Sequence, residues 1–135
     1  MSVHSSARKK VPAAIRNFQS AMQFLNCMTD YEKMSRVGYN TANFSLARMS
    51  RLLSAVGNPH RKLKTVHIAG TKGKGSTAAM LSAMLTNSGL KVGLYTSPHL
   101  MNIRERVQIN DKMISEADMT RLMAKIAPVV KKLAK

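Results

Sequence analysis

One short stretch constrains the fold of this chain more than any other feature. Residues 65–69, TVHIA, form an apolar, β-branched run, and the glycine-rich turn GTKGKGST follows at once at residues 70–77. A helical pattern then covers about residues 76–88, with Gly89 as its expected C-terminal cap. KVGLYT at residues 91–96 again has the composition of a strand. This order predicts a buried strand, a turn, a helix and a second, parallel strand, which together make a βαβ unit.

The turn predicts an anion-binding site. A strand that enters a helix through such a turn directs backbone N–H groups and the positive end of the helix dipole at one spot. Gly70, Gly73 and Gly75 are expected to provide positive φ angles and close approach to a phosphate oxygen, and Lys74 a point charge. The sequence of the turn does not match the Walker A motif, because Gly75 stands where that motif has its Mg²⁺-binding hydroxyl. The plainer alternative is a glycine-rich connection with two solvated lysines.

Helical patterns flank this unit on its amino-terminal side. Apolar residues recur at helical spacing after Pro12, at Ile15, Phe18, Met22 and Leu25, and predict an amphipathic helix. A second apolar stripe ends at Val56, where Gly57 is placed for a C-terminal cap. The polar residues 29–44 between these patterns predict a loop.

Beyond the second strand, the sequence predicts a turn and a last helix. Residues 106–110, RVQIN, suit a short strand that turns at Asn110 and Asp111, and Ser115 with Asp118 suits the cap of a helix. Pro128 falls inside this helix and is expected to kink it, so that residues 119–127 are its firmer part.

The composition of the chain limits the classes of molecule that it is expected to bind. A chain of 135 residues allows one modest domain, and a formal charge of +16 favours an anionic partner. Nucleic acid ranks below small anions, because aromatic residues make up 4% and tryptophan is absent. No apolar window is long enough for a membrane helix. The single cysteine, Cys27, excludes an internal disulfide and is consistent with a reducing compartment.

Three ordered motifs resemble a known family. AGTKGKGST, GLYTSPHL and RERVQIN are similar to segments of folylpolyglutamate synthase and dihydrofolate synthase, in the Mur ligase superfamily, and FSLARMSRLLSAVGNPH precedes them. The resemblance runs from about Ala21 to the end of the chain. It implies an α/β fold of the P-loop NTPase-like type (the Mur ligase central domain), with a three-layer parallel sheet of which the first βαβ unit and the N-terminal helices are present.

The resemblance also implies a domain organisation. Residues 1–17 are expected to be a basic, disordered N-terminus, although their Ser-rich, basic composition is also typical of a transit peptide. Residues 18–135 would be the N-terminal part of a Mur-ligase-type ATP-binding domain. Family members are several-fold longer, so we expect this chain to be an N-terminal portion that is inactive and marginally folded alone.

The activity that the resemblance implies is ATP-dependent ligation of L-glutamate to folate or dihydropteroate through an acyl phosphate, with Mg²⁺. The chain would be cytoplasmic and monomeric, with small-molecule partners and neither nucleic acid nor membrane. The residues do not decide between folate and dihydropteroate. Two other classes stay open: a non-catalytic P-loop nucleotide-binding module or split-subunit partner, and a basic nucleic-acid binder.

Site residues follow from the resemblance position by position. Lys74 would be the catalytic residue that counters charge on the transferred phosphoryl group, and Lys72 replaces an asparagine common in bacterial members. Ser97 would bind Mg²⁺. The ATP-binding set is Gly70, Thr71, Lys72, Gly73, Lys74, Gly75, Ser76 and Thr77. The substrate-binding set is Ser97, Pro98, His99, Arg104 and Arg106. Without the resemblance, His99 is a loop histidine and Glu105 is a partner for neighbouring arginines.

Overall fold

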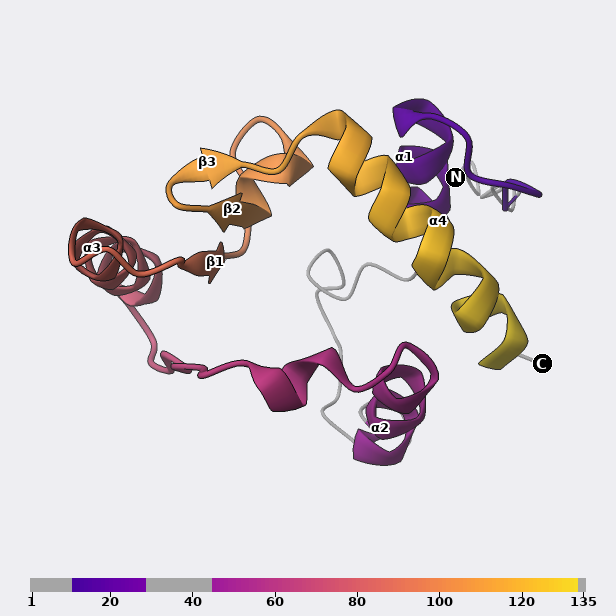
Figure 1. Cartoon of the computed structure of the whole chain (residues 1–135). Helices are drawn as coiled ribbons and strands as arrows, with labels where there is room; N and C mark the ends of the chain where they lie inside the picture. The colour runs from indigo at the N-terminus through magenta and orange to yellow at the C-terminus, as the bar shows by residue number, and fades with distance from the viewer. Residues whose placement is uncertain (1–10, 29–44, 134–135) are drawn as a thin grey trace, which may run out of the picture. The chain divides into compact units, whose positions relative to one another are not determined.

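The computed structural model describes residues 11–28 and 45–133 (Figure 1). Contacts between residues divide the chain into two units, Met1–His60 with Thr120–Lys135, and Arg61–Met119. The loop predicted at residues 29–44 lies outside the described residues, as does the first part of the predicted basic N-terminus.

The first unit contains helices α1 and α2 and most of helix α4. Their bounds are Phe18–Asn26 for α1, Leu46–Ala55 for α2 and Glu116–Leu133 for α4. Helix α1 begins later than the spacing after Pro12 predicts, because Asn17 caps it: the Asn17 side chain accepts the N–H of Ser20, and the Ser20 hydroxyl accepts the N–H of Asn17. Ala21 and Phe24 are the buried residues of this helix.

The predicted glycine caps are confirmed at two helices. Gly57 follows α2 with φ 88°, and Gly89 follows α3, which spans Lys74–Asn87, with φ 82°. After α3, the N–H of Gly89 donates to the carbonyl of Thr86 and the N–H of Leu90 to that of Leu85. This pair of bonds is a Schellman motif, and its positive φ favours glycine.

The second unit pairs α3 with a small antiparallel sheet. The strands are β1 (Gly93–Tyr95), β2 (Val107–Ile109) and β3 (Lys112–Met113), in the order β1-β2-β3, with a 3-10 helix, η3 (Ile103–Arg106), before β2. A further 3-10 helix, η2 (Pro59–Lys62), lies at the boundary of the two units. Asn110 and Asp111 join β2 to β3 with φ of 48° and 59°, which confirms the predicted turn and matches the positive φ angles of a tight hairpin.

The predicted strand at residues 65–69 is wrong. These residues form no strand, the side chain of Val66 is 70% exposed, and both pairings of the described sheet are antiparallel. Strand structure requires hydrogen bonds to a neighbouring strand, and no described segment pairs with this run. The α/β class therefore holds, whereas the parallel pair and the βαβ unit do not occur in the described part of the chain.

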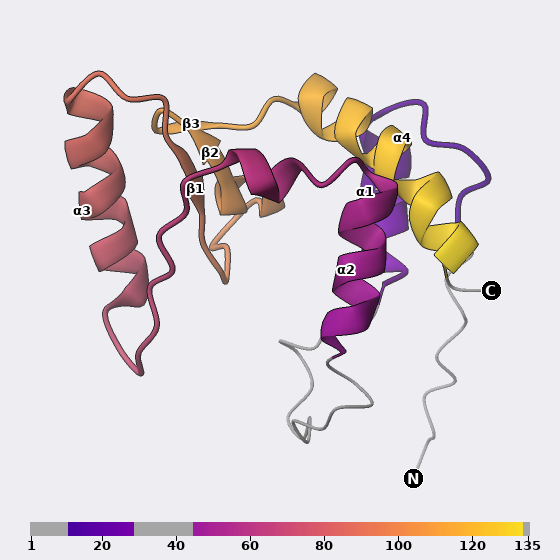
Figure 2. The ribbon, with the colours of Figure 1, turned by 60° about the horizontal axis from the view of Figure 1, so that its bottom comes forward.

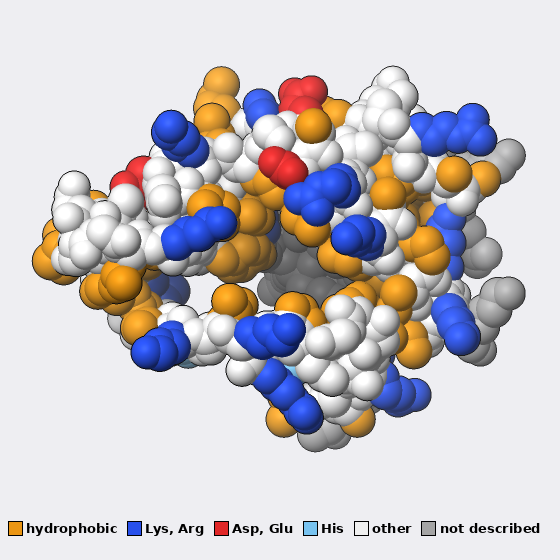
Figure 3. Space-filling view, in the orientation of Figure 1, with side chains coloured by type: hydrophobic (Ala, Val, Ile, Leu, Met, Phe, Trp, Pro, Cys, Tyr) orange, Lys and Arg blue, Asp and Glu red, His pale blue; other side chains and the backbone are white. Residues whose placement is uncertain are grey.

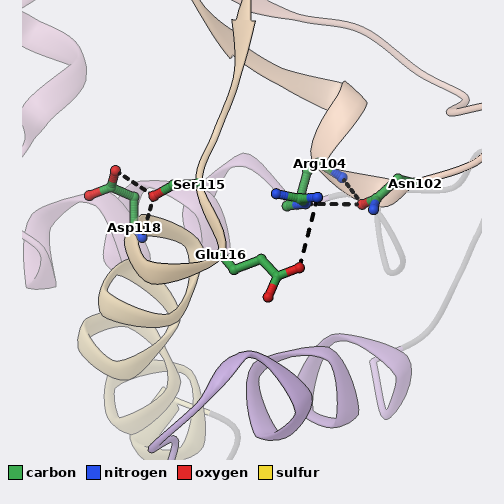
Figure 4. A network of polar contacts seen from close by, with 5 residues as sticks. All are labelled: Asn102, Arg104, Ser115, Glu116 and Asp118. Carbon is green, nitrogen blue, oxygen red and sulfur yellow. Dashed lines mark hydrogen bonds and ion pairs between the residues drawn. The ribbon is translucent and has the colours of Figure 1, made fainter.

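Helix α4 begins as its cap predicts and extends further than its proline suggests. The Ser115 hydroxyl accepts the N–H of Asp118 at 3.0 Å and donates to the Asp118 carboxylate at 2.8 Å (Figure 4). The helix continues through Pro128, which is exposed, to Leu133. The ammonium of Lys131, near the end of the helix, donates to the carbonyl of Pro12.

The described residues bury little apolar surface. The buried hydrophobic side chains among them are Ala21, Phe24, Met119 and Ala127. None of the described helices combines the length and apolar character that a bilayer crossing needs. On the face drawn in Figure 3, Lys and Arg side chains stand out in many places and acidic side chains are sparse, in keeping with the formal charge of +16. A small core is consistent with the prediction of marginal stability.

Candidate functional site

The glycine-rich turn ends as the cap of α3. Gly73 is the N-cap with φ 76°, and Gly70 has φ 152°. Positive φ is therefore confirmed at these two glycines. It is wrong at Gly75, because α3 begins at Lys74, two residues before the predicted start, and Gly75 is already helical. A Cβ added at Gly75 would meet nothing within 4 Å, so the fold itself does not require glycine there.

The side chain of Lys74 folds back over the turn. Its ammonium donates to the carbonyl of Gly70 at 2.7 Å and to that of Thr71 at 3.3 Å. At the same place, the first N–H groups of α3 have no acceptor within the helix, as at every helix start. A cation and a helix amino terminus thus meet at one exposed turn, which is an arrangement suited to an anion.

The other polar side chains of the turn differ in what they do. The Thr77 hydroxyl donates to the carbonyl of Gly73 at 3.0 Å, beside the backbone bond from the Thr77 N–H to the same carbonyl at 2.9 Å. This hydroxyl therefore supports the first turn of α3. Thr71, Lys72 and Ser76 are exposed, which leaves their side chains accessible to a ligand.

The second group of predicted residues lies in the loop of residues 97–106, between β1 and β2. Ser97 and Pro98, joined by a cis peptide bond, are exposed. The Arg106 Nε donates to His99 Nδ1 at 2.9 Å, and the Thr96 N–H donates to the Arg106 carbonyl at 3.1 Å. These bonds close the base of the loop and bring His99 and Arg106 together.

Glu105 holds the tip of this loop, and its role was not predicted. Its carboxylate accepts the N–H groups of Leu100 at 2.8 Å, Met101 at 3.0 Å and Asn102 at 2.6 Å. Hydrogen bonds from Leu100 and then Asn102 hold the pKa of Glu105 below its usual range, because they stabilise the charged form. The prediction that Glu105 pairs with arginines is wrong, since its carboxylate accepts three backbone N–H groups instead. The Asn102-x-x-Glu105 spacing of a capping box was the available signal.

Arg104 is also held by neighbours in the loop region. Its backbone N–H and its Nε donate to the Asn102 side-chain oxygen at 3.0 and 3.4 Å, and its guanidinium lies 3.8 Å from the Glu116 carboxylate (Figure 4). Glu116 opens α4, so this pair joins the loop to the start of that helix. It is partly solvated, which limits its strength.

The turn and the loop belong to the same unit. Helix α3 contacts β1. In Figure 2, the amino-terminal end of α3 and the chain that follows β1 both lie toward the bottom of the view. The hydrogen bonds of Lys74 and Thr77 lie within residues 70–77, and the bond between Arg106 and His99 lies within residues 97–106. Each group therefore has contacts of its own that order its side chains.

The polar groups of the turn and the loop suit the phosphate groups of ATP better than they suit Mg²⁺. The turn fits phosphate, as its ammonium, its helix start and the open space beside Gly75 show. For a metal, the described ranges contain no group of three His, Cys, Asp or Glu side chains. Ser97 contributes one exposed hydroxyl, which alone does not make a site for a cation that takes several oxygen ligands.

Solved structures that resemble this chain are synthases, and two of them are complexes with an adenine nucleotide or its analogue. A folylpolyglutamate synthase complex with AMPPCP and folate matches with a TM-score of 0.71 and 30% identity, over 87% of this chain and 27% of that one. Folylpolyglutamate synthase of Mycobacterium tuberculosis with ADP and AMPPCP matches with a TM-score of 0.64 and 40% identity, over 66% of this chain and 20% of that one.

Curated relatives give the particular family. The dihydrofolate synthase/folylpolyglutamate synthase of Bacillus subtilis is 40% identical over 88 residues, which are 65% of this chain and 20% of the relative. A probable bifunctional folylpolyglutamate synthase/dihydropteroate synthase of Haloferax volcanii is 47% identical over 78 residues, 58% of this chain and 9% of the relative. No family model matches. The chain is thus related to the folylpolyglutamate and dihydrofolate synthases, as its motifs predicted, and spans about a fifth or less of these relatives' length.

Proposed function

We propose that this chain supplies the phosphate-binding turn and an acceptor-binding loop of an ATP-dependent ligase that adds L-glutamate to folate or dihydropteroate. The observation that carries the proposal is the Lys74 ammonium, held over the Gly73-capped start of α3 by the carbonyls of Gly70 and Thr71. Relatives solved with ADP, AMPPCP and folate support the choice of ligands.

At the turn, binding of ATP would give the Lys74 ammonium charged phosphate acceptors in place of neutral carbonyl acceptors. Carbonyl oxygens orient its ammonium without neutralising it, so an ATP phosphate would replace weak acceptors with strong ones. The exposed N–H groups at the start of α3 would add further donors, and the open space beside Gly75 would admit a phosphate oxygen close to the backbone. Lys74 would then counter the charge that develops on the transferred phosphoryl group.

At the loop, Arg104 and Arg106 would bind the acceptor. Planar guanidinium groups suit carboxylates, which a folate-type acceptor carries. The neighbours of Arg104 and Arg106 orient them at modest cost, since the Glu116 pair at 3.8 Å is exposed on its acidic side. Ser97, Pro98 and His99 would complete the acceptor-binding set, with Ser97 as one oxygen ligand of Mg²⁺.

The proposed reaction has two displacements. A carboxylate oxygen of the acceptor attacks the γ-phosphorus of ATP, and ADP leaves to give an acyl phosphate. The amine of glutamate then attacks the acyl carbon, so that an amide forms and inorganic phosphate and a proton depart. Bound Mg²⁺ would offset phosphate charge, and its ligands are not complete among the described residues.

Calorimetric titration of the protein with AMPPCP tests the nucleotide part of the proposal. Lys74→Ala removes a charge-assisted hydrogen bond of about 1.5–3 kcal/mol, so affinity should fall roughly 10- to 100-fold. Lys91→Ala is the control, since Lys91 carries the same charge and is exposed but lies outside the turn, and it should change affinity by less than about threefold.

Two results of this titration would contradict the proposal. One is wild-type affinity in Lys74→Ala; the other is equal loss in both variants, which would indicate attraction by net charge alone. Circular dichroism of each variant controls for the helix. Co-purification of a separate chain that supplies the rest of the ligase would favour the alternative of a non-catalytic nucleotide-binding module or split-subunit partner.

A further inference from the structure

The loop of residues 97–106 exposes two large apolar side chains at its tip. Leu100 is 91% exposed and Met101 is 92% exposed. Side chains this exposed gain no packing energy that would hold their backbone in one conformation. The order of the tip must therefore come from its backbone hydrogen bonds.

Those bonds converge on one carboxylate. Leu100, Met101 and Asn102 donate consecutive N–H groups to the two oxygens of Glu105. Three successive N–H groups can reach one acceptor only where the backbone curves around it, as in anion-binding nests. With the N–H groups directed at Glu105, the side chains of Leu100 and Met101 remain outside the curve.

The other hydrogen bonds of the loop do not hold its tip. Thr96 and His99 are bonded to Arg106 at the base, and Asn102 caps η3 through the N–H of Arg104. Neither arrangement contacts the N–H groups of Leu100 or Met101. Among the described contacts, the Glu105 carboxylate alone accepts them.

We propose that Glu105 is a positioning residue for the folate-type acceptor: its carboxylate shapes the loop tip so that Leu100 and Met101 form an apolar contact for the acceptor's ring. This inference rests on the proposed function of the loop. It differs from a role in direct binding, because the Glu105 oxygens are occupied by backbone and act through the two apolar side chains.

Amide hydrogen exchange and ligand titration of the protein test this role together. Glu105→Gln keeps the size of the side chain but has one carbonyl oxygen, which can accept two N–H groups at most. Exchange at residues 100–102 should accelerate by about tenfold or more, and exchange within α3 should not change. The matched control is Glu116→Gln, which removes the same charge near Arg104 and should leave exchange at the tip within about twofold.

Titration with folate and with AMPPCP supplies a readout that a general loss of structure would not give. Glu105→Gln should weaken folate binding by about tenfold and leave AMPPCP binding within about twofold, because the turn is held by other residues. Wild-type folate affinity in Glu105→Gln, or unchanged exchange at the tip, would overturn the positioning role alone. Absence of folate binding by the wild-type protein would overturn the proposed acceptor site and this inference with it.

An acid titration of the wild-type protein gives a second check. Since the pKa of Glu105 is lower in the loop than in an unfolded chain, protection of residues 100–102 should be complete above about pH 4.3. It should be lost as the pH falls through the lowered pKa. His99 acts electrostatically on this carboxylate. The other charged groups of the loop and of the start of α4 are Arg104, Arg106, Glu116 and Asp118. Acid-sensitive protection that persists in Glu105→Gln would assign the effect to one of them.

Discussion

Two glycines of the phosphate turn provide a matched test of the structure. Gly73→Ala and Gly75→Ala each add one methyl group, two positions apart. At Gly73 the φ of 76° costs an alanine about 1–2 kcal/mol, and no atom within 4 Å adds a steric contribution. At Gly75 the backbone is helical and the space is open, so alanine should stabilise the chain by about 0.5–1 kcal/mol. The two variants should therefore differ by about 1.5–3 kcal/mol in the free energy of unfolding.

Urea unfolding followed by far-ultraviolet circular dichroism measures this difference. Both variants and the wild-type protein are compared at the same concentration, and a shared slope against urea shows that stability alone has changed. Equal stability of the two variants, or a more stable Gly73→Ala, would refute the assignment of Gly73 as a left-handed cap.

Nucleotide binding should separate the two roles of these glycines. If a phosphate oxygen approaches the backbone at Gly75, the added methyl group of Gly75→Ala would obstruct it. This variant should then be more stable than wild type and yet bind AMPPCP more weakly, a combination that general destabilisation cannot produce. Wild-type AMPPCP affinity in Gly75→Ala would contradict close approach at this position.

Further predictions concern caps and turns, and the same urea titration measures them. Ser115→Ala should cost about 1 kcal/mol because it removes the acceptor for the Asp118 N–H, whereas Ser45→Ala, at an N-cap with no side-chain bond, should cost less than about 0.5 kcal/mol; equal losses would contradict the assigned caps. Asn110→Val should lose about 2 kcal/mol or more, since it adds strain at φ 48° to the loss of the bond from the Val92 N–H. Asn110→Gly loses the bond alone and should cost less.

Features that depend on a few neighbouring residues were predictable from the sequence. Gly57 and Gly89 end helices because their positive φ is the local condition of a Schellman motif. Asn110 and Asp111 form the hairpin turn for a similar reason. The position of Lys74 beside the turn also follows from its place in the sequence, although its carbonyl partners do not.

Features that depend on distant partners were not predictable. The β-branched residues at 65–69 have the composition of a buried strand, yet a strand exists only where another backbone pairs with it. Val66 is exposed instead.

The error at Glu105 is of a different kind, because its partners are local. Charge favoured a nearby arginine, while three backbone N–H groups a few residues upstream offered better geometry. The prediction for Glu105 gave too much weight to the charge of nearby side chains and too little to backbone N–H groups that lacked an acceptor.

The net charge of +16 contributes to binding only in part, because the cations of the site already have partners. At the site, Lys74 is oriented by carbonyls, Arg106 by the ring nitrogen of His99, and Arg104 by Asn102 and Glu116. An anion that binds these groups must replace existing acceptors, so affinity reflects the difference between two sets of contacts. Net charge raises the rate of encounter with any polyanion, but it does not select among polyanions. Selection depends on which ligand offers oxygens where the carbonyls of the turn now lie. For that reason Lys74→Ala and Lys91→Ala, which remove the same charge, are expected to differ.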